Sequence, residues 1–203
     1  MSLKVRWMVA MAAFCTIGAH VVVAEQPKAA QPPMDPAKME AMKQLGSPSE
    51  GHKAFEPLVG TWTYTAQFWM APDTQPQTMT GTATNSVIFD GRFLQQEITG
   101  TAEGQPFHGM GYLGYDNIRK EYQSIWFDNM MTGMMVATGE FDPATKTLSE
   151  HGTFSCPMTG ETQRWFRTAW TVVDPNHASY QSFSRTPSGQ EFKSMDIQYT
   201  RTS

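Results

Sequence analysis

Few reactive side chains in the sequence have the spacing of a known catalytic or ligand-binding site. Cys156 precedes Pro157 near a predicted turn and is the only cysteine beyond residue 24. A catalytic thiol or hydroxyl needs a histidine and an acid close by in space, and a lone cysteine is more often inert structure. There is no Gly-x-Ser-x-Gly elbow and no phosphate-binding glycine loop followed by a helix. We predict no catalytic residue of this kind.

Carboxylate pairs are the next candidates, because two acids can share acid–base work on a small substrate. Most aspartates fall at predicted turns, where their side chains bond to nearby backbone groups. Glu97 and Asp128 instead lie within or at the end of predicted strands, as does His108. They define an enzyme hypothesis, which requires two of them within hydrogen-bonding reach inside one pocket.

A metal site is a third possibility. The methionines cluster at Met130, Met131, Met134 and Met135, with Cys156 and Met158 further along. Soft sulfur donors suit Cu(I), but adjacent residues of a strand face opposite sides, so at most about half of the cluster could converge. The histidines lack the spacing of common ligand sets. We predict no metal and no cofactor, and we assign the methionines to a flexible apolar lining.

The elements that would position these residues begin after an export signal. Lys4 and Arg6 precede an apolar stretch that ends at Ala24, which is typical of a cleavable secretory signal peptide. The chain has 15 basic and 19 acidic residues, and loss of Lys4 and Arg6 leaves 13 basic, a net charge of about −6. An exported, acidic chain of this kind is a poor partner for nucleic acid. We expect an exported protein, periplasmic or extracellular, with no membrane span after cleavage.

The rest of the chain divides into three segments. Residues 25–34 form a Pro-rich linker, and residues 35–56 a short helical segment that starts at Asp35 and Pro36 and breaks at Gly46. Residues 57–203 are dominated by Thr, Val and aromatic residues, with a turn signal roughly every dozen positions. Asp90-Gly91 is the sharpest hairpin signal. About ten strands are expected, near 61–70, 78–89, 92–99, 107–114, 120–127, 131–140, 146–155, 161–173, 178–185 and 190–200.

Short loops force these strands into an antiparallel meander, and twist and exposed edges favour its closure. The prediction is an all-β fold, a single antiparallel up-and-down β-barrel with a short N-terminal helix; a two-sheet sandwich is the alternative. Trp62, Tyr64, Ala66 and Phe68 share one face of the first strand. Later faces mix aromatic and polar residues, and Leu and Ile are scarce, which favours a cavity over a dry core.

A wider sequence pattern resembles a known family. It consists of Leu58-x-Gly60-x-Trp62, Gly91-Arg92-Phe93, Gly114-Tyr115-Asp116-Asn117, Trp126-x-Asp128 and Pro157-Met158-Thr159-Gly160. Over about residues 37 to 202 it resembles a bacterial, often exported domain family of unknown function that is grouped by fold with the lipocalin-like (calycin) barrels. The resemblance implies the barrel but no activity. In such barrels the Trp closes one end, often against an Arg of the last strand, which implies that Arg201 contacts Trp62.

Three functions follow from this reading. The first is a non-enzymatic module that binds a small, largely apolar ligand inside the barrel. The second is the enzyme described above, and the third is an interaction or structural protein with a filled core and an exposed apolar patch. The oligomeric state is left open. For the first function the expected ligand contacts are Trp62, Tyr64, Phe68, Tyr122 and Trp126, with Arg92 and Asp128 as polar anchors.

Overall fold

A computed structural model describes residues 35–102 and 104–202. The predicted signal peptide, residues 1–24, and the linker, residues 25–34, lie outside the described residues. Two helices precede ten strands, and the elements follow one another in a simple order. They are α1 (Pro36–Leu45), η1 (Glu50–Leu58), β1 (Gly60–Phe68), β2 (Gln77–Ile88), β3 (Phe93–Ala102), β4 (Gln105–Asp116), β5 (Glu121–Asp128), β6 (Met135–Asp142), β7 (Thr147–Phe154), β8 (Arg164–Asp174), β9 (His177–Arg185) and β10 (Glu191–Arg201).

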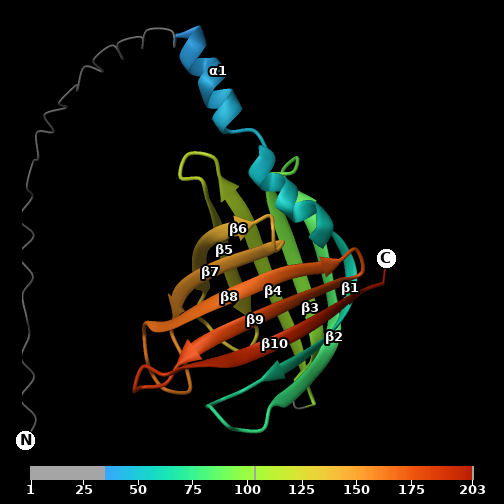
Figure 1. Ribbon diagram of the computed structural model, residues 1–203, viewed down its shortest axis with the longest axis vertical. Helices are drawn as coiled ribbons and strands as arrows, with labels where there is room; N and C mark the ends of the chain where they lie inside the picture. Colours follow the sequence, from blue (N-terminus) through green and yellow to red (C-terminus); the bar gives the residue numbers. More distant parts are fainter. Residues whose placement is uncertain (1–34, 103, 203) are drawn as a thin grey trace, which may run out of the picture. The chain divides into compact units, whose positions relative to one another are not determined.

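The ten strands form a closed barrel. Each strand pairs antiparallel with the next in sequence, and β1 closes the ring by pairing with β10 from Trp62–Arg201 to Phe68–Met195 (Figure 1). Closure leaves no strand edge free for pairing with another chain. The up-and-down barrel predicted from the sequence is therefore confirmed, and the two-sheet alternative is wrong.

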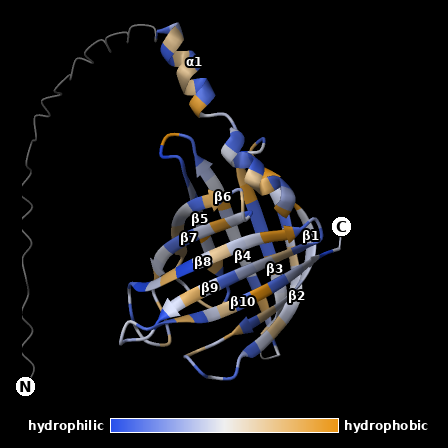
Figure 2. Ribbon diagram, viewed as in Figure 1, coloured by the Kyte–Doolittle hydropathy of each residue, from blue (hydrophilic) through white to orange (hydrophobic). Residues whose placement is uncertain are grey.

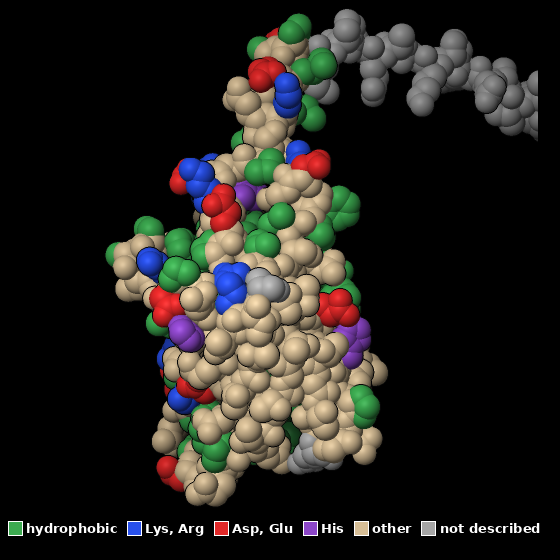
Figure 3. Space-filling view, turned by 90° about the vertical axis from the view of Figure 1, so that its right-hand side faces the viewer, with side chains coloured by type: hydrophobic (Ala, Val, Ile, Leu, Met, Phe, Trp, Pro, Cys, Tyr) green, Lys and Arg blue, Asp and Glu red, His purple; other side chains and the backbone are tan. Residues whose placement is uncertain are grey.

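The strand faces separate a lipophilic interior from a polar exterior. Along β1, Trp62, Tyr64 and Ala66 are buried while Thr63 and Thr65 are exposed. The hydropathy colours alternate along the strands in the same way (Figure 2). Figure 3 shows an outer face with few charged and few hydrophobic side chains, in keeping with the outward threonines of β1 and β2. This period of two is what places side chains inside the barrel.

Helix η1 covers one end of the barrel. Its Phe55 and Leu58 are buried in one cluster with residues of β3, β4, β5, β7 and β8. The Leu58 carbonyl accepts hydrogen bonds from Trp62 Nε1 at 3.0 Å and from Asn85 Nδ2 at 2.8 Å. These two bonds satisfy the carbonyl at the end of the helix and tie it to β1 and β2. The covered end is thus a packed plug.

Arg201 fastens this plug from the last strand. Its guanidinium carbon lies 4.0 Å from the centre of a Trp62 ring, so the cation–π contact that the resemblance implied is confirmed. The same guanidinium donates hydrogen bonds to the carbonyls of Pro57, Val59 and Pro175. One side chain therefore joins the plug, the first strand and the β8–β9 turn.

Two local features differ from the sequence-based expectation. The β2–β3 turn was expected to centre on Asp90-Gly91, but Phe89 also has a positive φ of 50°, and Ile88 pairs with Phe93 across a four-residue loop. The helical segment expected over residues 35–56 breaks at Gly46, and its second part is a 3-10 helix that continues through Pro57 to Leu58. Helix α1 buries none of its residues. Among the described residues, no helix is long and apolar enough to cross a membrane.

Candidate ligand-binding cavity

The inward faces of the strands enclose a cavity of about 590 Å³. It lies beyond the plug and opens between the loops at the opposite end, where Trp69 and Met70 follow β1 and Met130 and Met131 follow β5. Most of its wall is apolar, from Leu94 near the plug to Phe68 near the opening. Ligand sites of small molecules usually have this size and lining. The barrel interior is therefore not the filled core of the third function.

The rim of the opening is rich in methionine. Met70, Met130 and Met158 line the cavity and are 45%, 62% and 67% exposed, respectively. Thioether side chains are flexible and polarisable, so they adapt to ligands of different shape. Within residues 35–102 and 104–202, no group of three His, Cys, Asp or Glu residues is placed to hold a metal ion.

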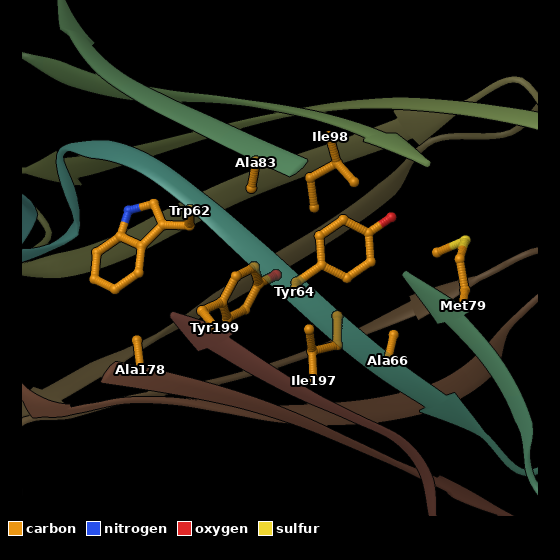
Figure 4. Close-up of a cluster of buried hydrophobic side chains, with 9 residues drawn as sticks. All are labelled: Trp62, Tyr64, Ala66, Met79, Ala83, Ile98, Ala178, Ile197 and Tyr199. Atoms are coloured by element: carbon orange, nitrogen blue, oxygen red, sulfur yellow. The ribbon is translucent and has the colours of Figure 1, made fainter. Parts of the chain in front are cut away.

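Tyrosine rings form one side of the interior. Tyr64 and Tyr199 are neighbours in the buried cluster (Figure 4). Their ring centroids are 6.0 Å apart and their ring planes are tilted by 52°. Tyr64 Oη donates a long hydrogen bond of 3.4 Å to the Thr99 carbonyl. Burial raises the pKa of Tyr64 to about 12, and it raises the pKa of Tyr199 as well. Both phenols are therefore neutral donors at physiological pH.

A polar cluster interrupts the apolar wall on β7 and β8. Glu150 and Thr168 are 7% and 3% exposed, and Trp170 lies two residues further along β8. Glu150 Oε1, Thr168 Oγ1 and Trp170 Nε1 are buried without a hydrogen-bond partner among the described residues. All three side chains line the cavity. Buried polar atoms usually have partners, so this cluster is the most unusual feature of the interior.

Burial changes the acidity of this cluster. It raises the pKa of Glu150 to about 6, although a hydrogen bond with Ser124 acts in the opposite direction. Burial also raises the pKa of Tyr180, and the negative charge of Glu150 adds to that effect. The low polarity around the carboxyl disfavours its charged form. A ligand that donated a hydrogen bond to Glu150 would compensate for this cost.

Four of the seven residues predicted to contact a ligand lie in the cavity wall. They are Tyr64, Phe68, Trp126 and Asp128. Trp126 Nε1 donates a 2.9 Å hydrogen bond to Asp128 Oδ2, and the other oxygen of this carboxylate accepts from the backbone nitrogen of Met130. Asp128 is thus already partnered at the rim. Ligand contact by these four residues stays a prediction.

The other three predicted residues lie away from the cavity. Trp62 is 1% exposed beneath Arg201. Tyr122 packs under the plug and donates a 2.7 Å hydrogen bond to the Gly51 carbonyl. Arg92 lies in the β2–β3 turn, where its Nε donates to the Gly46 carbonyl at 2.8 Å. All three hold the covered end together, so the geometry gives them a structural role.

The acid–base candidates do not meet inside the cavity. His108 Nε2 lies 3.0 Å from Glu97 Oε1, and both side chains are about half exposed on the outer faces of β3 and β4. Asp128 lines the cavity without either of them. Cys156 is buried in the wall, 3.8 Å from one nitrogen of Arg164. The arrangement that the enzyme hypothesis requires is absent from the described cavity.

The β7–β8 cluster was not predicted from the sequence. The strand near 146–155 was expected, but its faces were not assigned. The alternation from Leu148 through Glu150 to Phe154 could have predicted it, because a glutamate on the same face of the strand as buried Leu148 must point inward.

A closed ten-stranded antiparallel barrel with an internal cavity and a helical plug resembles the lipocalin-like (calycin) barrels in its fold. The chain belongs to the family described as protein of unknown function (DUF1579), which matches residues 47–201. The resemblance noted in the sequence is thereby confirmed. No curated protein matches the sequence.

Two solved structures share the fold. Rv2717c from M. tuberculosis is 14% identical with a TM-score of 0.58, over 77% of this chain and 100% of that one. The S-type phycobiliprotein lyase CPES from Guillardia theta is 11% identical with a TM-score of 0.51, over 77% of this chain and 99% of that one. At these identities the similarity shows the fold alone.

Proposed function

We propose that the mature protein, exported after cleavage near Ala24, is a non-enzymatic barrel that binds one small, largely apolar molecule. The observation that supports this most strongly is the cavity of about 590 Å³, plugged at one end, open at the other and lined mainly by apolar side chains. Its size lies in the range of roughly 300–1,000 Å³ that is usual for small-molecule sites. The flexible methionine rim favours entry of a hydrophobic molecule at the open end.

A matched pair of substitutions on β6 tests the proposal. Ala137 is 5% exposed and lines the cavity, whereas its neighbour Thr138 is on the opposite face of the strand. Ala137→Phe puts a ring into the cavity, and Thr138→Phe puts the same ring outside. We expect wild type and Thr138→Phe to bind a lipophilic fluorescent dye alike, and Ala137→Phe to bind it at least about tenfold more weakly. Equal dye affinity in Ala137→Phe, with a native circular dichroism spectrum, would show that the dye binds elsewhere.

A further inference from the structure

The β7–β8 cluster has hydrogen-bonding capacity that the described residues leave unused. Glu150 Oε1, Thr168 Oγ1 and Trp170 Nε1 are buried in the cavity wall; the Tyr180 phenol lies against the Thr168 hydroxyl, and Glu150 Oε1 and Trp170 Nε1 have no partner within the described part of the chain. The other charged side chains of the wall are already engaged: Asp128 accepts from Trp126, and Arg164 donates to Ser184 Oγ at 2.9 Å. Among the described residues, the buried side-chain polar atoms without a partner therefore all lie in this cluster.

The sheet register brings these three side chains together. Glu150 lies directly opposite Thr168 in the β7–β8 ladder, and Trp170 follows on the same face of β8. Side chains at such positions start about 5 Å apart across strands and about 7 Å apart along one strand. A single functional group of a bound molecule can therefore reach more than one of them.

The donor and acceptor types of the cluster restrict that group. The indole nitrogen of Trp170 only donates, the ionised carboxylate of Glu150 only accepts, and the hydroxyl of Thr168 does either. The bound group must bring an acceptor for Trp170 and a donor for Glu150. A carboxylate would be repelled by Glu150, and an ammonium group, although attracted to Glu150, would leave Trp170 Nε1 without an acceptor.

We propose that Glu150, Thr168 and Trp170 bind an uncharged head group with a donor and an acceptor side by side, as in a primary carboxamide, on an otherwise apolar ligand. This inference rests on the proposed function and specifies the class of ligand. The head group lies against the β7–β8 wall, and the apolar part extends past Phe68 towards the methionine rim.

Four probes with one alkyl chain test this ligand class. Decanamide carries donor and acceptor, methyl decanoate only acceptors, decanoate a negative charge, and decylammonium only donors. Affinities are measured by competition with a lipophilic dye near neutral pH. We expect decanamide to bind about tenfold more tightly than methyl decanoate, and decanoate and decylammonium to bind more weakly than the amide.

Variants of the cluster separate head-group recognition from cavity binding. Glu150→Leu should reduce the amide-to-ester affinity ratio from about ten to about one while dye binding persists. Trp170→Phe should weaken decanamide about tenfold more than Trp126→Phe does, because the Trp126 nitrogen already bonds Asp128. Trp170→Phe also keeps the test open if Glu150→Leu does not fold.

The outcomes distinguish the two proposals. The ligand class would be overturned if wild type bound amide and ester equally, or bound decanoate or decylammonium most tightly. If wild type still bound the dye in that case, the proposed function would stand. An amide preference that persisted in Glu150→Leu, or a loss of decanamide affinity in Trp170→Phe no larger than in Trp126→Phe, would also overturn the ligand class. Failure of the dye and of every probe to bind would overturn both proposals.

Discussion

Replacing Glu150 by a residue that cannot ionise should favour the variant over wild type by more free energy of unfolding at neutral pH than at acidic pH. The folded protein holds this carboxyl with a pKa of about 6, against an ordinary value of 4.5, because burial disfavours its charge. Below about pH 4.5 the group is protonated in both states and adds nothing. As the pH rises through 6, the unfolded chain releases its proton first, so the free energy of unfolding falls.

The size of this effect follows from the two pKa values. A rise from 4.5 to about 6 corresponds to about 2 kcal/mol of unfolding free energy lost between acidic and neutral pH. Glu150→Gln keeps the shape of the side chain but cannot ionise, so it does not suffer this loss. The difference in unfolding free energy between the variant and wild type should therefore move by about 2 kcal/mol in favour of Gln from about pH 4 to about pH 7.5.

Urea unfolding of both proteins at the two pH values measures this difference. His52, whose pKa burial lowers, makes wild type and variant alike less stable in acid, so the comparison cancels its effect. Glu140→Gln, which removes a charge from an exposed position on β6, reports the effect of net charge alone. If Glu150→Gln differs from wild type by the same free energy at both pH values, burial does not raise the pKa of Glu150 in the folded protein.

Three further predictions concern the plug, the wall and the cavity. Arg201→Ala should lower the free energy of unfolding by about 2–4 kcal/mol, because it removes the ring contact with Trp62 and several charged hydrogen bonds. Arg201→Lys should lower it less, because lysine keeps the charge but not the planar group. An Ala variant as stable as wild type in urea would contradict this role of Arg201. Gly139→Ala should lower the free energy of unfolding by more than about 3 kcal/mol or prevent folding, because its Cβ would lie 1.9 Å from the Ser149 carbonyl oxygen. In the control Gly133→Ala the nearest atom to the new Cβ is 4.0 Å away, so the free energy of unfolding should change by less than about 0.5 kcal/mol. Similar unfolding curves for the two variants would be inconsistent with this packing. Alkylation of Cys156, which lies in the cavity wall, by a bulky apolar maleimide should abolish dye binding, with Cys156→Ser as the unreactive control. Unchanged dye binding after labelling that mass spectrometry shows to be complete would mean that the dye binds outside the cavity.

Much of the fold follows from local sequence signals. Alternation along β1 separates Trp62 and Tyr64 from Thr63 and Thr65, and short turns between the strands leave a closed meander as the stable arrangement. The β2–β3 turn was harder to predict, because the positive φ of Phe89 is set by the register of the two strands and not by a glycine or asparagine at that position.

The site was predictable only in part, because alternation shows which face a residue occupies but not its depth in the barrel. Trp62 and Tyr64 share a face, yet Trp62 packs beneath Arg201 and the plug while Tyr64 borders the cavity. Glu150 and Thr168 were missed for a different reason. A polar residue in a strand is ordinarily expected on the outside, and the pairing of β7 with β8 brings these two to face the interior together.

Native mass spectrometry of the protein from its own exported fraction, with Ala137→Phe prepared in parallel, measures whether the barrel carries a ligand. We expect a chain that begins at Glu25 and carries one small molecule in wild type, and the same chain without that molecule in Ala137→Phe. Release of the molecule by denaturation would then identify its head group. An empty wild-type barrel, or an equal load on Ala137→Phe, would contradict binding in the cavity.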